Sequence, residues 1–316
     1  MISGKVKGYL IGAVAAASYG TNPLFALPLY NEGMNPDIVL FYRYLLAIPV
    51  LGLMLLLRRG SQEFKISSRQ TFQLFLMGLL MAFSSLSLFM SYQYMDAGIA
   101  STLLFVYPIM VALIMTIGFK EKFKISTALC IIMALTGIGL LYETSDGTTL
   151  NLTGTWLVMI SSLTYAIYIV GVNESKLKHM PTLKIIFYVL VFGLLVFIFK
   201  ILYSGQFIFP RSLLSWGCVV GLAVVPTAVS FLCTTRAIHL IGPTPTAILG
   251  ALEPVTAVVI GVLVFQEILT WRIIIGIVLI LCAVSLIVTG GKLPHSMTHI
   301  KKLFPKLTHK QNNHLK

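Results

Sequence analysis

Charged residues are scarce in this chain. Asp, Glu, Lys and Arg make up 10% of its 316 residues, and apolar residues make up 57%. Soluble domains carry about 25% charged residues, so this composition excludes an ordinary soluble protein. The apolar residues gather in long runs, and a helix that crosses a bilayer needs about 20 of them in succession. The sequence therefore predicts an all-α membrane protein.

Signatures of catalysis and of cofactor binding are also missing. The sequence has no GxSxG, no HExxH, no Walker A loop and no close pair of carboxylates within a predicted span. The four cysteines form no CxxC pair, and His295 and His299 lack a third metal ligand. We therefore expect no enzyme, no cofactor and no metal. Without an ATP-binding domain, any pumping would draw on a gradient.

The apolar runs predict ten membrane-spanning helices in two groups of five. We expect a first repeat over 1–142, a connecting loop over 143–153, a second repeat over 154–290 and a basic tail over 291–316. The spans are predicted near 8–30, 36–57, 71–94, 97–119, 125–142, 154–173, 182–203, 212–235, 241–265 and 272–290.

The second half of the chain repeats the first at an offset of about 146 positions. Landmarks align as follows: Gly8 with Gly154, Tyr19 with Tyr165, Phe41 with Phe187, Tyr42 with Tyr188, Pro108 with Pro254, Phe119 with Phe265 and Glu121 with Glu267. Because each half crosses five times, the second half enters the membrane from the opposite face. Such an inverted repeat is typical of secondary transporters, in which two mirrored arrangements give alternating access.

The net charge of +13 is distributed unevenly across the predicted loops. If the N-terminus is cytoplasmic, almost every Lys and Arg falls on the cytoplasmic side, and the other side keeps only Lys200, Arg211 and Arg272. The positive-inside rule then places both termini in the cytoplasm. We expect the protein to lie in the inner (cell) membrane. No basic face with interleaved aromatics suggests nucleic acid, so the expected surroundings are lipid.

Two charged residues lie well away from the ends of predicted spans, Arg43 in the second and Glu253 in the ninth. An intramembrane charge costs about 2.5–3.5 kcal/mol on insertion scales, which makes it a candidate functional residue. Glu253 could bind an amino group or a coupling proton, or it could satisfy backbone groups freed by Pro254. Arg43 could orient a substrate carboxylate, or it could pair with an acid or extend toward the membrane surface.

Prolines and polar aromatics mark the remaining candidate positions. Pro108 and Pro254 are repeat mates near mid-membrane and are candidate hinges or helix kinks, although membrane helices tolerate proline in general. Serine, threonine and tyrosine recur in the first, third, sixth and eighth spans, where they could join helices or line a cavity. The residues that we expect in a substrate cavity are Tyr19, Asn22, Tyr92, Tyr107, Tyr165 and Glu253.

The chain resembles the EamA-domain branch of the drug/metabolite transporter superfamily over nearly its full length. The resemblance rests on the two five-helix repeats, on Pro108 through Phe119-Lys120-Glu121 and Pro254 through Phe265-Gln266-Glu267, and on Phe41-x-Arg43. Tyr19 and Tyr165 stand where the family often has tryptophan. The resemblance implies an inverted-repeat transporter with a central cavity lined by the first, third, fourth, sixth, eighth and ninth helices.

The leading hypothesis is a secondary transporter that exports a small metabolite such as an amino acid or an amine, with the proton as a candidate coupling ion. One alternative is a passive facilitator or exchanger of the same fold, which would be insensitive to a proton gradient. An alternative of another class is a membrane-embedded enzyme or sensor, which would need a convergent set of acid, base or metal groups.

Overall fold

The structure is a computed structural model that describes residues 4–59, 64–120, 125–142, 151–205, 207–241, 246 and 249–288. These residues are almost entirely helical, and no strand occurs among them. The predicted inter-repeat loop (143–153, except its last three residues), the residue Glu121 and the basic tail 291–316 lie outside the described part. The predicted all-α fold class is therefore confirmed for the part of the chain that is described.

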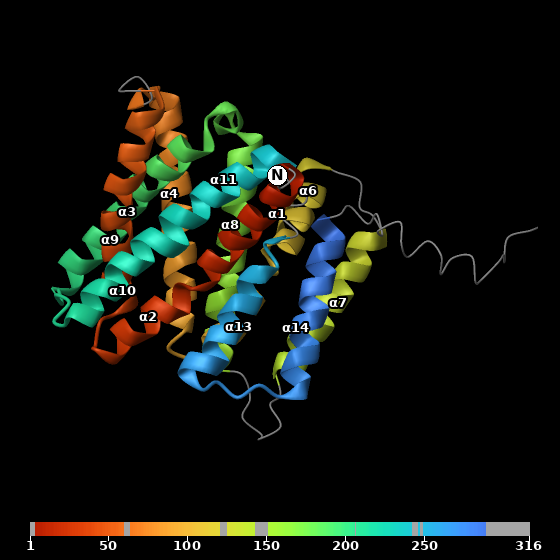
Figure 1. The fold of residues 1–316 in the computed structure, drawn as a ribbon. Coiled ribbons are helices and arrows are strands. Elements are labelled where there is room, and N and C mark those ends of the chain that lie inside the picture. Colours follow the sequence, from red (N-terminus) through yellow and green to blue (C-terminus); the bar gives the residue numbers. More distant parts are fainter. Residues whose placement is uncertain are drawn as a thin grey trace, which may run out of the picture.

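The helices follow one another as two series (Figure 1). The first series consists of α1 (Gly4–Gly20), α2 (Asn22–Asn31), α3 (Pro36–Arg59), α4 (Ser68–Ser91), α5 (Ala97–Leu104), α6 (Tyr107–Phe119) and α7 (Ile125–Tyr142). The second consists of α8 (Leu152–Glu174), the 3-10 helix η2 (Lys176–His179), α9 (Thr182–Ser204), α10 (Leu213–Ala223), the π-helix η3 (Val224–Val229), α11 (Ser230–Ile241), α13 (Leu252–Phe265) and α14 (Trp271–Val288).

Within the described residues, seven helical stretches are long and apolar enough to cross a membrane. They are Lys5–Asn31, Pro36–Leu57, Ser68–Ser91, Ala97–Phe119, Leu152–Glu174, Thr182–Ser204 and Leu213–Thr234. Shorter apolar helices, Ile131–Leu140, Leu252–Phe265 and Trp271–Leu286, occupy the places of the fifth, ninth and tenth predicted spans. The chain is thus a multi-pass membrane protein, and the expected count of ten crossings stays a prediction.

Several of these stretches are broken where the sequence places proline. Pro23 lies in the first turn of α2 and Pro108 in the first turn of α6, where a missing N–H costs no helical hydrogen bond. Pro226 instead lies inside η3, where the backbone widens into a π-turn. The predicted first, fourth and eighth spans are therefore each divided into shorter segments, and the residues at the breaks face inward.

The two halves share an unusual backbone feature at the repeat offset. Lys120 ends α6 with φ 56° and Gln266 ends α13 with φ 58°, and these are the two non-glycine residues with positive φ in the described chain. The N–H groups at the two caps bond to the carbonyls of Met115 and Gly261 respectively. Left-handed backbone is rare outside glycine, so its occurrence 146 positions apart supports the repeat independently of side-chain identity.

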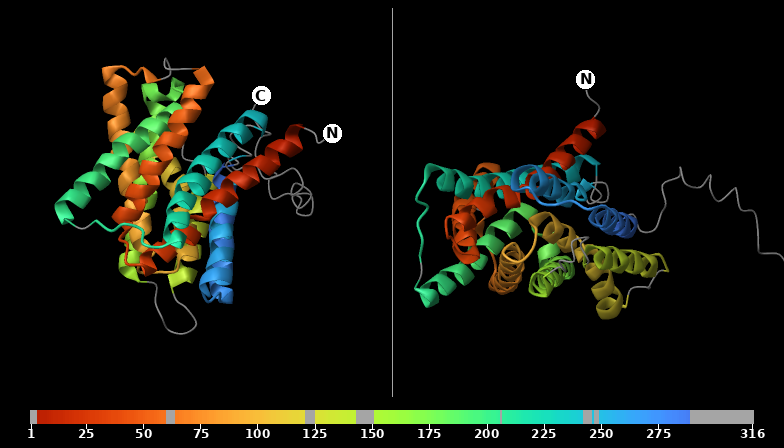
Figure 2. Two further views of the ribbon diagram at one scale, coloured as in Figure 1. Left: turned by 60° about the vertical axis from the view of Figure 1, so that its left-hand side comes forward. Right: turned by 90° about the horizontal axis from the view of Figure 1, so that it is seen from below.

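The helices pack as a bundle in which the two series interleave. α4 packs against α8 and α9, α1 against α11, and α5 against α13, while α7 and α14 form a pair at one edge (Figures 1 and 2). The α4–α9 crossing is close: a Cβ at Gly78 would lie 2.7 Å from the Phe192 Cβ, and one at Gly193 would lie 3.2 Å from the Gly78 carbonyl oxygen. Small residues at such crossings are how membrane helices gain packing energy.

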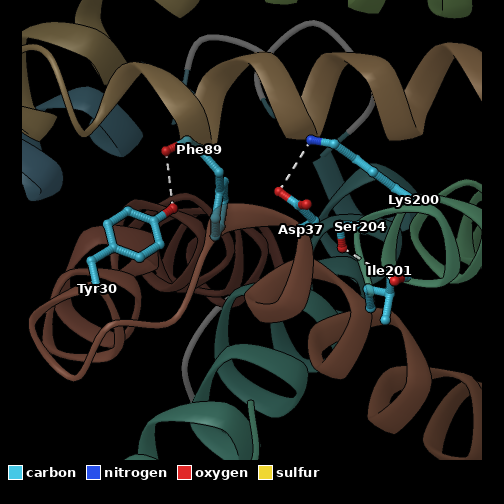
Figure 3. A network of polar contacts seen from close by, with 6 residues as sticks. All are labelled: Tyr30, Asp37, Phe89, Lys200, Ile201 and Ser204. Atoms are coloured by element: carbon cyan, nitrogen blue, oxygen red, sulfur yellow. Dashed lines mark hydrogen bonds and ion pairs between the residues drawn. The ribbon is translucent and has the colours of Figure 1, made fainter. Parts of the chain in front are cut away.

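Hydrogen bonds and an ion pair also join helices that are far apart in the sequence (Figure 3). The Tyr30 hydroxyl of α2 donates to the Phe89 carbonyl of α4 at 2.9 Å, and Lys200 of α9 pairs with Asp37 of α3 at 3.1 Å. The Ser84 and Ser161 hydroxyls also join α4 to α8, with a separation of 3.1 Å in a fully buried position. These contacts hold the walls of the central space described next.

Candidate functional site

A cavity of about 370 Å³ lies between helices of both series. Its walls come from α1, α3, α4, α5, α6, α8, α11 and α13. The lining residues are Gly12, Ala15, Ala16, Tyr19, Arg43, Met81, Ser84, Ser85, Leu88, Phe89, Leu104, Tyr107, Tyr165, Ser230, Phe231, Thr234, Thr246, Gly250 and Glu253. The volume suits a small organic molecule, and concave apolar sites with a few polar groups are the usual form of ligand pockets.

Arg43 of α3 presents its guanidinium to this cavity from a buried position, with 4% of the residue exposed. Its Nε donates to the Thr227 hydroxyl at 3.1 Å, and the guanidinium carbon lies 5.9 Å from the Tyr19 ring centre and 5.5 Å from the Phe89 ring centre. Both distances are within the range of a cation–π contact. Arg43 is thus held by its hydrogen bond to Thr227 and by two aromatic faces.

The position of Thr227 depends on the π-turn of η3. The Thr227 hydroxyl donates to the Leu222 carbonyl five residues earlier at 2.9 Å while it accepts from Arg43. In a regular helix this carbonyl would accept the N–H of the residue four positions later, but that residue is Pro226, which has no N–H, so the carbonyl is open to a side-chain donor. The hydroxyl therefore links a distorted helix to the one buried arginine of the cavity wall.

Glu253 faces the same cavity from the first turn of α13. The helix begins there because the chain turns at Gly250 and Ala251, and an acidic side chain in a first turn interacts favourably with the helix dipole. Arg43 and Glu253 thus bring charges of opposite sign to one space from α3 and α13. A space of this kind suits a dipolar or singly charged guest.

Three tyrosines belong to the aromatic part of the wall. The Tyr107 and Tyr165 rings meet edge to face with centres 4.7 Å apart, and Tyr165 stacks on Tyr168 at 5.9 Å. Tyr19 lies against Arg43. Aromatic faces in this arrangement supply contact area for an apolar group or for a cation.

The structure brings together most of the residues that the sequence proposed for the cavity. Five of them line it: Tyr19, Tyr107, Tyr165, Arg43 and Glu253. Asn22 and Tyr92 do not: Asn22 is buried below the α1–α2 break, where its amide donates to the Tyr19 carbonyl at 2.8 Å, and Tyr92 caps α4 against Phe89. Whether the lining residues bind a substrate stays a prediction.

The two mid-membrane prolines also have defined places. Pro108 lies in the first turn of α6, just after the break that separates it from α5. Pro254 lies in the first turn of α13, next to Glu253. Both prolines therefore start a helix at the level of the cavity instead of bending the middle of one, and their role as hinges stays a prediction.

Some wall residues carried no signal in the sequence. Met81, Phe89 and Phe231 line the cavity, but an apolar residue in an apolar span cannot be assigned to lipid or to cavity from its type. Ser84 and Ser85 belonged to a polar group that was visible in the third span. Only the neighbouring helices show that they face inward, since Ser85 meets the Tyr44 hydroxyl at 2.9 Å.

The sequence profile of the EamA-like transporter family matches the chain twice, over residues 6–143 and 152–289. A transporter of Archaeoglobus fulgidus, named as uncharacterized, is 30% identical over 189 residues, which cover 60% of this chain and 66% of the relative. An uncharacterized transporter of Synechocystis sp. is 31% identical over 216 residues, or 66% of this chain and 64% of the relative. The chain spans just under two thirds of the length of these two relatives.

Two further similarities extend over more of the chain. An uncharacterized transporter of Clostridium kluyveri is 22% identical over 283 residues, covering 87% of this chain and 91% of the relative. A crystal structure superposes with a TM-score of 0.64 and 15% identity, covering 91% of this chain and 98% of the other. At this identity the second similarity concerns the fold alone.

Proposed function

The chain belongs to the EamA-like transporter family and is a membrane transporter of the drug/metabolite type, and we propose that it exports a small metabolite such as an amino acid or an amine. The observation that supports this proposal is the cavity of about 370 Å³ that holds Arg43, Glu253 and three tyrosines. A carboxylate would meet Arg43, an amino group would meet Glu253, and an apolar side chain would meet the aromatic wall.

The proposed cycle uses the two repeats as mirrored halves. We expect an inverted arrangement, with the first repeat over 1–142, the second over 154–290 and both termini in the cytoplasm. The cavity would then be exposed to one face of the cell membrane at a time. Glu253 would bind either the substrate or a proton, Arg43 would orient the substrate, and Pro108 and Pro254 would mark the hinges.

The first step of the test identifies a ligand by thermal stabilisation. Purified protein is melted with a panel of amino acids, the corresponding amines and the corresponding amides. A ligand of the folded form at 100 times its Kd adds about 2.7 kcal/mol of stability, which raises the Tm measurably. If every member of the panel leaves the Tm unchanged, an amino acid or amine substrate is ruled out.

The second step measures uptake of that ligand into proteoliposomes with and without an imposed pH gradient. Glu253→Gln should lose both the gradient dependence and most of the transport, because the amide neither binds a proton nor pairs with an ammonium group. The control is Glu174→Gln, which makes the same change at the exposed end of α8. Unchanged uptake and unchanged pH dependence in Glu253→Gln would remove this residue from the mechanism.

The same assay separates the alternatives. A passive facilitator or exchanger of this fold would equilibrate the ligand with no response to a protonophore. A membrane-embedded enzyme or sensor would bind the ligand without moving it. The described residues contain no group of three or more His, Cys, Asp or Glu side chains that could hold a metal, which gives the enzyme alternative no support.

A further inference from the structure

Two helices separate the cavity from one face of the molecule. α5 reaches the cavity with its last residue, Leu104, and α13 reaches it with Glu253 near its start. Their other ends, at Ala97 and at Phe265, lie away from the cavity, and the two helices pack against each other. On the opposite side the lining continues along α1 from Tyr19 back to Gly12, toward the end that carries the N-terminus. The wall of α5 and α13 therefore closes one mouth.

A single side chain joins the outer ends of this wall. The Glu267 carboxylate, two residues beyond α13, accepts the Ala97 N–H at the start of α5 at 2.9 Å. The Glu267 N–H bonds in turn to the Gly261 carbonyl at 3.0 Å, which folds the residue back over its own helix. Ala97 belongs to the first series of helices and Glu267 to the second, so the contact ties one repeat to the other.

The surrounding residues leave room for this carboxylate and for nothing larger. A Cβ at Gly98 would lie 3.0 Å from a Glu267 carboxylate oxygen and 2.9 Å from the Val258 Cα. A Cβ at Gly261 would overlap the same carboxyl group. The half-buried side chain therefore lies between two glycines, one on each helix, and separation of the helices would break the contact.

The charge around Glu267 is unfavourable for an ionised carboxylate. Burial raises the pKa of Glu267 to about 7, and the Asp96 carboxylate just before α5 acts in the same direction, against the lowering effect of backbone hydrogen bonds from Ala97 and Gly98. Burial also raises the pKa of Asp96. The helix α5 itself carries no titratable residue. The helix α13 adds only Glu253 at its far end, and α14 adds Arg272 in its first turn.

We propose that Glu267 is a pH-sensitive lock that holds this mouth of the cavity closed and releases it when the carboxyl group loses its proton. This inference rests on the proposed transport cycle, which requires each mouth to open in turn. The neutral carboxyl still accepts the Ala97 N–H, whereas the ionised form places a charge in an enclosed site beside Asp96.

The direction of the pH effect follows from the raised pKa. Opening exposes Glu267 to water and returns its pKa to the ordinary value of 4.5, so the closed form binds the proton more tightly than the open form. The proton-dependent stabilisation of the closed form is thus fully present below about pH 4.5 and is lost as the pH rises through about 7. Above that pH the stabilisation is absent. Raising the pH from 5 to 8 should open this mouth.

The sequence of the other repeat differs at the position that corresponds to Ala97. The residue 146 positions after Ala97 is Pro243, which has no backbone N–H to donate. The two repeats therefore differ in sequence at the point where this contact is made. A change of pH therefore biases the mouth at Glu267 through a contact that the other repeat cannot make with the same backbone donor.

The test is cysteine labelling from the Glu267 face of the membrane and needs no substrate. The four native cysteines are replaced, Ala16 in the cavity wall is changed to cysteine, and an impermeant maleimide is added at several values between pH 5 and 8. Rates are divided by those of Gln93→Cys, an exposed position next to the same mouth, which removes the pH dependence of thiol chemistry. Transport is measured separately, so failure of the lock and failure of the proposed function are distinguishable.

Labelling of Ala16→Cys should rise with pH when Glu267 is present. Glu267→Gln, which stays neutral and keeps an acceptor, should remain slow at every pH, and Glu267→Ala should be fast at every pH. Asp96→Asn removes the neighbouring charge and should move the rise to lower pH. A parent protein whose normalised labelling does not change with pH, or a Glu267→Gln variant that responds to pH as the parent does, would overturn the proposal.

Discussion

The hydrogen bond between Arg43 and Thr227 provides a direct test of how the cavity wall is held. Thr227→Val keeps the shape of the side chain and removes the hydroxyl that accepts the Arg43 Nε at 3.1 Å. Arg43 is 4% exposed and Thr227 is 1% exposed, so water has little access to replace the lost acceptor. An unpaired buried donor on a charged group costs about 1.5–3 kcal/mol.

The expected effect is a fall in Tm of roughly 3–6 °C in detergent, at about 2 °C per kcal/mol for a chain of this size. Thr227→Ser is the control, because it keeps the hydroxyl and loses one methyl group at a cost of about 1 kcal/mol. Thr227→Val also removes the bond to the Leu222 carbonyl, so its total effect does not isolate the arginine contact.

A double-mutant cycle with Arg43→Met separates the two contributions. In the Arg43→Met background, Thr227→Val should cost about 0.5–3 kcal/mol less than in the parent protein, because the charged donor is already absent. Equal costs in the two backgrounds, or a Thr227→Ser variant that is as unstable as Thr227→Val, would refute the proposed chain of contacts from Leu222 through Thr227 to Arg43.

Two further predictions concern packing and surface charge. Gly193→Ala should destabilise the protein by about 1–3 kcal/mol, because its Cβ would lie 2.8 Å from the Tyr44 ring and 3.2 Å from the Gly78 carbonyl, whereas Gly217→Ala, with nothing within 4 Å, should not. Equal melting temperatures for the two variants would contradict this view of the α4–α9 crossing. Hydrogen bonds from Ser215 and Ser212 lower the pKa of Glu32, so its stabilising effect should be present above pH 4.5 and be lost as the pH falls through the lowered value. Glu32→Gln should therefore lower the Tm at neutral pH and have less effect near pH 3, and an equal effect at both would contradict the linkage.

Much of the candidate site could be predicted from residue type because charges and tyrosines are rare inside apolar spans. Five candidate residues could be recognised for that reason, and all five line the cavity: Arg43, Glu253, Tyr19, Tyr107 and Tyr165. Charge and aromatic polarity are costly in lipid, so such residues turn inward wherever the helices sit.

The two predicted cavity residues that fall elsewhere show where this reasoning ends. Asn22 was predicted in the cavity because it belongs to a polar group in the first span. The chain breaks at Thr21, and the Asn22 amide at the start of the new helix donates to the Tyr19 carbonyl. Tyr92 ends α4, where its ring packs on Phe89, which itself lines the cavity. The direction of a side chain changes at a helix break or a helix end, and the helical period of the sequence predicts directions only within a continuous helix.

The repeat was evident from matching residues, whereas the contacts between the repeats were not. Glu267 was recognised as the mate of Glu121, with no indication that it bonds to Ala97, which lies 170 positions earlier. The contact of Thr227 with Arg43 likewise joins two segments that lie 184 positions apart in the chain.

The sequence by itself determined the environment and the plan of this protein: long apolar runs demand lipid, backbone groups in lipid demand helices, and the recurrence of landmarks gives two related halves. The tertiary structure alone decided which side chains share the cavity and which helix ends meet across the repeats. The physical reason is that burial in lipid depends on the composition of each segment, whereas a hydrogen bond or a close glycine contact depends on the positions of two segments that are far apart in the chain.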